Sequence, residues 1–484
     1  MLRDLFTLSQ AAHKLWHPYS IPVWITLYIL ILFTLKVAQP YSLSPDEAEQ
    51  MILTQGWAWG YGTQPPLYTW LQILVFEITG PGRFGLAVLK HGLLLAIYLG
   101  VWRLARMVGA DQRVAGVAML GTLLIPTLLW SAQRDLTHTV LAVAVSIWVV
   151  IAALLALRTQ TWVTFALVGV LAAASILSKW NVVFVILGGA VAILSMPQAR
   201  TWRWWISVGV IVALMIRPAM WMLDHWTIAT SGIARFDATD GPGMGAAAQA
   251  LVSFVQGLLA DYALVALLLL ICFGLPAWGR ADWPIRLIRR MILAAIGIII
   301  MAALGSGATV IHQRWVLPPL VFAPMVAVFA LAPSITRRNT VWFTGIGGAL
   351  VLIFGLIIPQ LLPVLGDRPM RKQVPIAAIA QALPDGNLVV LTESAMLAGN
   401  LRAMRPEISV GLPGFPPQTE ARPIHVIWGR AFAPFNGSLG NLTSFAQEHT
   451  GQTINSSAIA PITVPYPPPF ESWLYYLYIA DVSQ

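Results

Sequence analysis

The sequence predicts an all-α polytopic membrane domain followed by a small C-terminal α/β domain. Of the 484 residues, 58% are hydrophobic and only 10% are charged, and the mean hydropathy is +0.74. Soluble globular chains carry about 25% charged residues, so this composition excludes a soluble protein. From about residue 365 the apolar runs shorten to strand length and Pro, Asn, Asp and Thr become more frequent. That change predicts a second architecture at the C-terminal end.

Eleven apolar stretches approach the roughly 20 residues that a membrane-spanning helix needs. When these spans simply alternate, the arginine-rich connections all fall on one side, as the positive-inside rule requires. The basic residues of that side are Arg3, Lys14, Arg103, Arg106, Arg113, Arg158, Arg200, Arg203, Arg280, Arg286, Arg289, Arg290, Arg337 and Arg338. The predicted spans are 20–38, 84–106, 114–132, 136–157, 161–178, 181–197, 203–220, 259–278, 291–311, 315–333 and 341–363.

The basic residues explain the net charge of +9, so nucleic-acid binding is excluded. Residues 1–20 do not resemble a cleavable signal, because the apolar run from Ile21 is long enough to span and lacks a small-x-small cleavage site. The first connection on the opposite face, 39–83, is predicted to contain two surface helices. Residues 45–57 open with Ser-Pro and early acidic residues, and 66–79 are apolar but too short to span. The connection 221–250 is predicted to be a long loop.

The predicted C-terminal α/β domain covers 365–484, about 120 residues, which is an ordinary domain size. Strands are predicted at 387–392, 425–428 and 474–479, with a helix at 395–404. The remaining 1–364 form the predicted membrane domain. Cys272 is the one cysteine in the sequence, which excludes an intramolecular disulfide and a cysteine metal cluster.

Polar motifs collect on the face opposite the arginine-rich loops. Ionisable groups are costly near lipid, so their gathering at one face predicts a reaction or binding site. Each motif also has a plain structural interpretation: acids can favour a helix N-terminus, an Asp can cap a helix, and a Lys at a span end can reach the headgroups. The motifs are Asp46-Glu47, the turn Gly60 to Leu67, Asp135, Lys179-Trp180 and His312-Gln313-Arg314-Trp315.

This order of motifs resembles the GT-C glycosyltransferases. Within them it is similar to the dolichyl-phosphate-mannose protein mannosyltransferase-like group, which includes the lipid A aminoarabinose transferases. The similarity rests on an Asp-Glu in the first outer loop, a Pro-Pro-Leu turn, an Asp opening the fourth span and a Ser-Lys after the fifth. It covers roughly residues 40–320, while the C-terminal domain matches only in kind. The resemblance implies an inverting enzyme of the bacterial inner membrane, with its active site and C-terminal domain on the periplasmic side.

The resemblance also implies a role for each motif. Asp46 would be the general base for the acceptor hydroxyl, with Glu47 tuning it or contacting the acceptor, and Asp135 would bind the acceptor or a metal. The leaving phosphate of a polyprenyl-phosphate sugar needs positive charge or hydrogen-bond donors, which Lys179, Arg314, Gln64 and His312 could supply. Tyr61, Trp180 and His225 are the candidate substrate-binding residues; His225 and His312 could also bind a phosphate or a divalent ion.

One position departs from the family pattern. The aminoarabinose transferases carry Glu-Lys directly before their Pro-Pro, whereas this chain has Thr63-Gln64. Gln64 can form hydrogen bonds but brings no charge, so a metal site built on that Glu is not expected here, and a divalent metal ion remains an open alternative.

Two other functions stay open at this stage. A transporter or flippase of a polyprenyl-linked or lipid substrate would gather polar residues near the midplane of the membrane and often has repeated halves. A noncatalytic lipid-binding protein of the same fold would keep the motifs without turnover. The expected partners of the transferase are a polyprenyl-phosphate sugar, an acceptor lipid, glycan or protein, and membrane lipids.

Overall fold

The computed structural model describes residues 20–231, 243–279, 281–417, 423–435, 439–455 and 458–482. Arg3, Lys14 and Arg280 therefore lie outside the described residues. The chain divides into two compact units. The helical unit holds 59–68 and 91–355 with the described residues up to Ile31, and the sheet unit holds 32–58, 69–90 and the residues from Leu356 onward. Each unit is described by itself.

Long apolar helices confirm a polytopic membrane domain. Within the described residues, seven helices are long and apolar enough to cross a membrane. Five of them begin and end within about one turn of a predicted span. In an apolar run that crosses a bilayer, the helix is the form that satisfies its own backbone hydrogen bonds. The seven are α2 (Ser20–Ala38), α5 (Arg83–Met107), α8 (Thr137–Thr159), α11 (Trp204–Asp224), α13 (Met244–Phe273), α14 (Trp283–Ser306) and Arg337–Leu365, which comprises α17 (Arg337–Leu350), η6 (Val351–Ile357) and α18 (Ile358–Leu365).

The other four predicted spans are bent or short. Two helix pairs pass the same test only together, with bends of 71° and 45°. Pro126 and Pro324 stand at the two breaks and account for them. The first pair is α6 (Gln112–Leu123) with η1 (Thr127–Ser131) and α7 (Ala132–Arg134); the second is α15 (Gln313–Leu320) with α16 (Ala323–Leu331) and η5 (Ala332–Ser334). The short helices are α9 (Trp162–Ser178), and η2 (Trp180–Val182) with α10 (Val183–Leu194).

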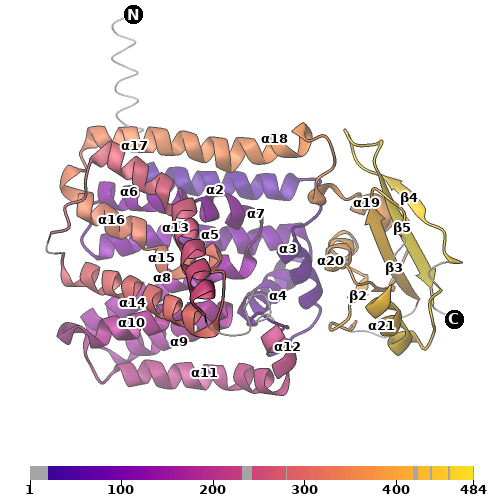
Figure 1. Cartoon of the computed structure of the whole chain (residues 1–484), viewed down its shortest axis with the longest axis horizontal. Helices are drawn as coiled ribbons and strands as arrows, with labels where there is room; N and C mark the ends of the chain where they lie inside the picture. Colours follow the sequence, from indigo (N-terminus) through magenta and orange to yellow (C-terminus); the bar gives the residue numbers. More distant parts are fainter. Residues whose placement is uncertain are drawn as a thin grey trace, which may run out of the picture. The chain divides into compact units, whose positions relative to one another are not determined.

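Small residues allow close packing in the helical unit. In Figure 1, α9, α10, α11 and α14 lie side by side, with α9 against α11 and α10 against α14. A Cβ at Gly188 would lie 2.6 Å from the Met291 carbonyl oxygen, and one at Gly169 would lie 2.7 Å from that of Ser207. Both glycines therefore mark helix contacts of the small-residue kind that membrane bundles favour.

The prediction of a long loop at 221–250 is wrong at both ends. Helix α11 continues to Asp224, the short α12 covers Trp226–Thr230, and α13 already begins at Met244. Residues 246–250 read Ala-Ala-Ala-Gln-Ala, which are strong helix formers although their hydropathy is modest. Helix α13 has 30 residues, about 45 Å at 1.5 Å per residue, so it exceeds the thickness of the hydrocarbon core.

The two predicted surface helices are present in the sheet unit. Helix α3 (Pro45–Leu53) begins with a proline after Ser44, and α4 covers Leu67–Thr79. Helix α3 packs on α20 (Ala395–Met404), and a Cβ at Gly399 would lie 2.1 Å from the Ala48 carbonyl oxygen. The close approach of these two helices joins the first connection of the chain to its C-terminal region.

A mixed sheet forms the rest of that unit. The described strands make one five-stranded sheet in the order β2-β1-β3-β5-β4. Strands β1, β2 and β3 are parallel, while β5 is antiparallel to both β3 and β4. The three predicted strands and the predicted helix 395–404 are confirmed as elements; β2 and β4 were not predicted. The strands are β1 (Val389–Leu391), β2 (Ser409–Gly411), β3 (Ile424–Ala431), β4 (Ile462–Pro465) and β5 (Leu474–Asp481).

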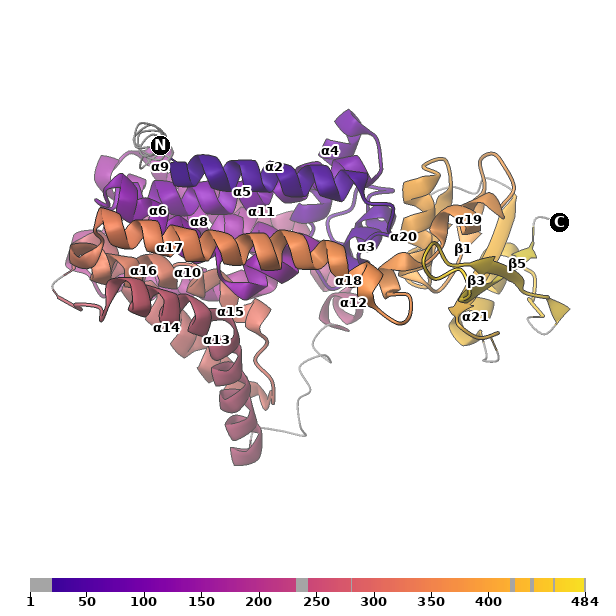
Figure 2. The ribbon, with the colours of Figure 1, turned by 90° about the horizontal axis from the view of Figure 1, so that it is seen from above.

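Helices cover both faces of the sheet. On one face, Ile379 of α19 (Ile376–Gln381) and Leu401 of α20 pack with Val390 in one core. On the other, Phe445 of α21 (Gly440–Thr450) packs with Leu391 in a second core. The alternation of neighbouring β1 residues between the two cores follows the two-residue period of a strand. Figure 1 shows α20 and α21 around the strands, and Figure 2 shows the same helices and strands from above.

Candidate functional site

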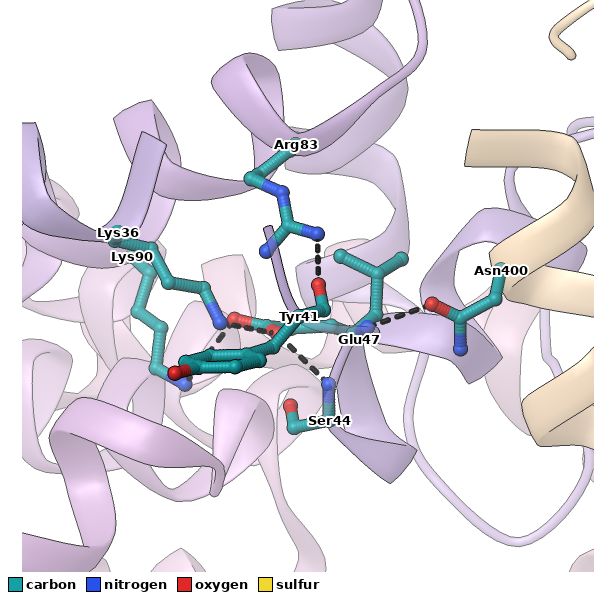
Figure 3. Close-up of polar contacts among 8 residues, drawn as sticks. Lys36, Tyr41, Ser44, Glu47, Arg83, Lys90 and Asn400 are labelled. Atoms are coloured by element: carbon teal, nitrogen blue, oxygen red, sulfur yellow. Dashed lines mark hydrogen bonds and ion pairs between the residues drawn. The ribbon is translucent and has the colours of Figure 1, made fainter. Parts of the chain in front are cut away.

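A buried carboxylate organises the sheet unit around the Asp-Glu motif. The Glu47 carboxylate is 2.7 Å from Lys36 Nζ and 3.7 Å from Lys90 Nζ, and the Ser44 N–H donates to it at 3.0 Å. Lys36 comes from the last turn of α2 and Lys90 from α5. The side chains of Glu47 and Lys90 are each 1% exposed. Figure 3 shows both ammonium groups converging on this carboxylate.

Opposing effects act on the pKa of Glu47. Burial raises the pKa, but the charges of Lys36 and Lys90 and the hydrogen bonds from Lys36 and the Ser44 N–H lower it more. The result is a pKa well below the usual range of a glutamate, because the ionised form alone can satisfy two ammonium groups. Glu47 is therefore a charged, buried anchor that joins α2, α3 and α5.

Backbone contacts fix the approach to α3 as well. The Leu43 N–H donates to Asn400 Oδ1 at 2.6 Å, and the Ser42 N–H donates to the Lys372 carbonyl at 2.7 Å. The Arg83 guanidinium donates to the Tyr41 carbonyl, as Figure 3 shows. Asp46, the predicted base, lies in the first turn of α3 and is half-buried. The backbone just before Asp46 is thus fixed by three contacts.

Arg402 adds a further connection between α20 and α3. Its guanidinium donates to the Met51 carbonyl and, at 3.2 Å, to Thr54 Oγ1. Burial lowers its pKa to about 10, which leaves the group charged at neutral pH. The Met51 carbonyl, one of the orphan carbonyls at the C-terminal end of α3, is satisfied in this way.

In the helical unit, Lys179 sits where a helix breaks. Helix α9 ends at Ser178, Lys179 is extended (φ −167°, ψ 135°), and the 3₁₀ turn η2 follows. Its Nζ donates to Thr139 Oγ1 in the first turn of α8 at 2.6 Å. His138 Nδ1 lies 3.3 Å from the Ser178 carbonyl oxygen. The half-buried ammonium is therefore held beside the N-terminal turn of α8, two to four residues after Asp135.

Hydrogen bonds bring the other predicted motifs to the same place. Trp180 Nε1 donates to the Thr63 carbonyl at 3.2 Å, next to Gln64, and Tyr61 pairs with Gln64 in a tight bridge. Tyr61 is buried and Gln64 half-buried. The turn predicted from the Gly-Tyr-Gly-Thr-Gln-Pro-Pro sequence thus lies against the Lys179-Trp180 link, within one unit.

Asn181 was not predicted as a site residue, yet it links two motifs. Its Nδ2 donates to the Trp315 carbonyl at 2.8 Å and lies 3.4 Å from that of Arg314. The His312 ring meets the Trp315 ring edge to face, with centroids 4.7 Å apart. Arg314 itself is exposed. The sequence signal for this contact was the Asn directly after Lys179-Trp180, because a side-chain amide can donate hydrogen bonds to the carbonyls at a helix start.

Asp135 occupies a strained turn. It is extended (φ −153°, ψ −154°), and Leu136, the residue before α8, has φ 65°. A bulky side chain in the left-handed region is uncommon and persists where its surroundings fix it. Leu136 occupies the N-cap position of α8, and Asp135 directly precedes it.

His225 lies at the end of α11. Its ring is exposed and stacks on Trp221 with centroids 4.7 Å apart. A Cβ at Gly60 would lie 2.0 Å from the Trp221 ring, so the Gly60 turn and this part of α11 are in contact. Among the described residues, no group of three or more His, Cys, Asp or Glu could hold a metal ion.

The helical unit therefore brings together Lys179, Trp180, Gln64 and the Arg314 segment, which is His312 to Trp315. Asp46 and Glu47 belong to the sheet unit.

The family model described as dolichyl-phosphate-mannose-protein mannosyltransferase matches residues 63–221. The crystal structure of ArnT from Cupriavidus metallidurans bound to undecaprenyl phosphate matches 95% of this chain and 99% of its own, with a TM-score of 0.58 and 12% identity. This fold, with that family match, is of the GT-C type.

Two curated proteins of Rhizobium johnstonii are similar along almost the whole chain. The lipopolysaccharide core galacturonosyltransferase RgtB is 29% identical, over 92% of this chain and 94% of its own. The lipopolysaccharide core galacturonosyltransferase RgtA is 27% identical, over 83% of this chain and 85% of its own. Together with the GT-C fold, these relatives identify the protein as a membrane glycosyltransferase.

Proposed function

We propose that the protein is an inverting glycosyltransferase that moves a monosaccharide from a polyprenyl phosphate to the core of lipopolysaccharide. The printed activities of its two curated relatives support this acceptor, and galacturonic acid is the first sugar to test. The undecaprenyl phosphate bound to the similarly folded ArnT supports the lipid carrier. One observation carries the proposal: within one unit, hydrogen bonds connect residues 179–181 to the turn before Gln64 and to the Arg314 segment.

The chemistry begins with the acceptor hydroxyl. Asp46 removes its proton, the freed oxygen attacks the anomeric carbon, and the bond from that carbon to the phosphate oxygen breaks on the opposite face. The configuration inverts, and the polyprenyl phosphate departs with the bonding electron pair. The half-buried Asp46 in the first turn of α3 is suited to this role because its neighbours hold its backbone in place.

The leaving phosphate gains negative charge as its bond to the sugar breaks, so it needs positioned donors. Lys179 and Arg314 supply charge, while Gln64 and His312 supply hydrogen-bond donors. Tyr61, Trp180 and His225 bind the substrate, and Asp135 binds the acceptor. Glu47 holds α3 through its two lysines rather than contacting the acceptor, since its side chain is 1% exposed.

The topology belongs to the same proposal. Eleven spans result when both bent pairs, α9, and η2 with α10 each cross the bilayer once. The arginine-rich loops then face the cytoplasm. The region 365–484 acts as a periplasmic domain, and the membrane is the bacterial inner membrane.

The test is a transfer assay with purified protein and a panel of polyprenyl-phosphate sugars, using lipopolysaccharide core as acceptor. We expect one donor, galacturonic acid first, to be consumed with stoichiometric product, and Asp46→Asn to lose about 10³-fold or more in kcat. Asp385→Asn, at an exposed turn in the sheet unit, is the matched control and should retain wild-type turnover. Equal turnover by Asp46→Asn would remove the base from the mechanism. Lipid binding without transfer from any donor would contradict the transferase.

A further inference from the structure

The bent segment Thr127–Arg134 leads directly to Asp135. Helix α6 ends at Leu123, and after a bend of 71° the chain continues through η1 and α7. The direction of the bent segment therefore decides where Asp135 lies.

A buried carboxylate holds the start of the bent segment. Asp261 lies in the middle of α13 and is 3% exposed. Its Oδ1 accepts a hydrogen bond from the Thr127 N–H at 3.1 Å, and Thr127 Oγ1 lies 2.7 Å and 2.9 Å from its two carboxyl oxygens. No ion pair with Asp261 is present among the described residues. An acidic residue inside a spanning helix is costly and needs a reason to stay, and the first N–H groups of a helix need an acceptor from elsewhere.

A tyrosine from a second span holds the other end. Tyr28 of α2 lies with its hydroxyl 2.9 Å from Gln133 Nε2 and 3.2 Å from Gln133 Oε1. A Cβ at Gly355 would lie 2.0 Å from the Tyr28 hydroxyl and 3.0 Å from Leu129 Cδ1. Gly355 thus leaves the space in which Tyr28 reaches the bent segment. All of these residues belong to the helical unit.

We infer that Asp261 and Tyr28 are positioning residues for Asp135. They act from two different spans on the two ends of the bent segment, and the strained Leu136 transmits that placement to the start of α8. The role of Asp135 in this inference rests on the proposed function. The two tethers, Asp261 with Thr127 and Tyr28 with Gln133, rest on the contacts given above.

The kinetic test compares Asp261→Leu, which keeps a similar size but removes both acceptor oxygens, Thr127→Val and Tyr28→Phe with Thr122→Val. Thr122 is a matched control because its buried hydroxyl, in the same broken span, donates to the Ala118 carbonyl of its own helix. We expect each of the three tether variants to raise the acceptor KM about tenfold, because each loses a hydrogen bond that holds the bent segment. Binding of polyprenyl phosphate, followed by native mass spectrometry, should be unchanged. Asp261→Leu and Thr127→Val should be non-additive because both act on the contact between Asp261 and Thr127.

Hydrogen exchange gives a measurement that does not depend on activity. Peptides covering 127–136 should exchange faster in the tether variants than in wild type or Thr122→Val. Unchanged exchange overturns the inference, and so does faster exchange with an unchanged acceptor KM, because Asp135 would then not depend on the tethers. If the wild type transfers no sugar, the proposed function has failed, whereas faster exchange in the variants would still support the tethers.

Discussion

Neutralising Glu47 should destabilise the sheet unit by several kcal/mol. Gln has nearly the shape of Glu and can still accept the Ser44 N–H, so Glu47→Gln removes little more than the charge. That charge is 2.7 Å from Lys36 Nζ and 3.7 Å from Lys90 Nζ. Removing one partner of a buried ion pair costs about 3–5 kcal/mol, because it leaves buried charge without compensation. Here two ammonium groups lose the same partner, so we expect the upper part of that range.

The assay is chemical denaturation of the detergent-purified protein, followed by tryptophan fluorescence. Glu77→Gln is the control, because Glu77 is exposed on α4 and should change the free energy of unfolding by no more than about 0.5 kcal/mol. The double variant Glu47→Gln with Lys90→Met should recover part of the loss, since one of the two stranded charges is removed. Lys90 is the better choice than Lys36, whose side chain is more exposed, 9% against 1%. A Glu47→Gln protein within about 1 kcal/mol of wild type would refute the reasoning.

Three further outcomes are expected. Glu47 has a lower pKa in the folded protein than in the unfolded chain, so its charge stabilises the fold above the unfolded pKa of ~4.3. This stabilisation is lost as pH falls from ~4.3 toward the folded pKa, so in that range the melting temperature of the wild type should drop more steeply than that of Glu47→Gln; parallel curves would contradict this. Gly399→Ala should destabilise by about 1–3 kcal/mol in the same denaturation assay, because its Cβ would lie 2.1 Å from the Ala48 carbonyl oxygen; a neutral effect would mean that α20 and α3 can separate freely. Trp180→Phe removes the donor to the Thr63 carbonyl, and a loss of about 1 kcal/mol corresponds to roughly a fivefold higher donor KM in the transfer assay; an unchanged KM would separate this contact from donor binding.

Most of the helices could be predicted from hydropathy because a bilayer leaves the backbone few alternatives. Helix 395–404 and three strands also followed from local patterns. Strand β2 (Ser409–Gly411) and strand β4 (Ile462–Pro465) did not, because three or four residues with Gly or Pro give too little alternation to recognise. The start of α13 was missed because alanine favours a helix more than its hydropathy suggests.

The candidate site was only partly visible in the sequence. Lys179, Trp180 and Gln64 stand at helix breaks that proline and polar residues mark, and their assigned roles remain predictions. The partners of Glu47 could not be predicted, since the local sequence around Lys36 and Lys90 does not show which group each lysine meets. Long-range pairing of this kind depends on how helices pack, and no local pattern in one sequence encodes it.

The contacts between α3 and α20 set an order on biogenesis. Leu43 and Met51 leave the ribosome early, whereas Asn400 and Arg402, which bind their backbone groups, are synthesised only after every predicted span. Until then, Glu47 can meet Lys36 and Lys90, but α20 is not yet present to bind the backbone on either side of Asp46. Chains of this kind fold from the N-terminal end as they are made, yet here the surroundings of Asp46 are completed last. A nascent chain stalled before α20 would already be inserted in the membrane, while the segment that carries Asp46 and Glu47 still lacks its contacts with α20.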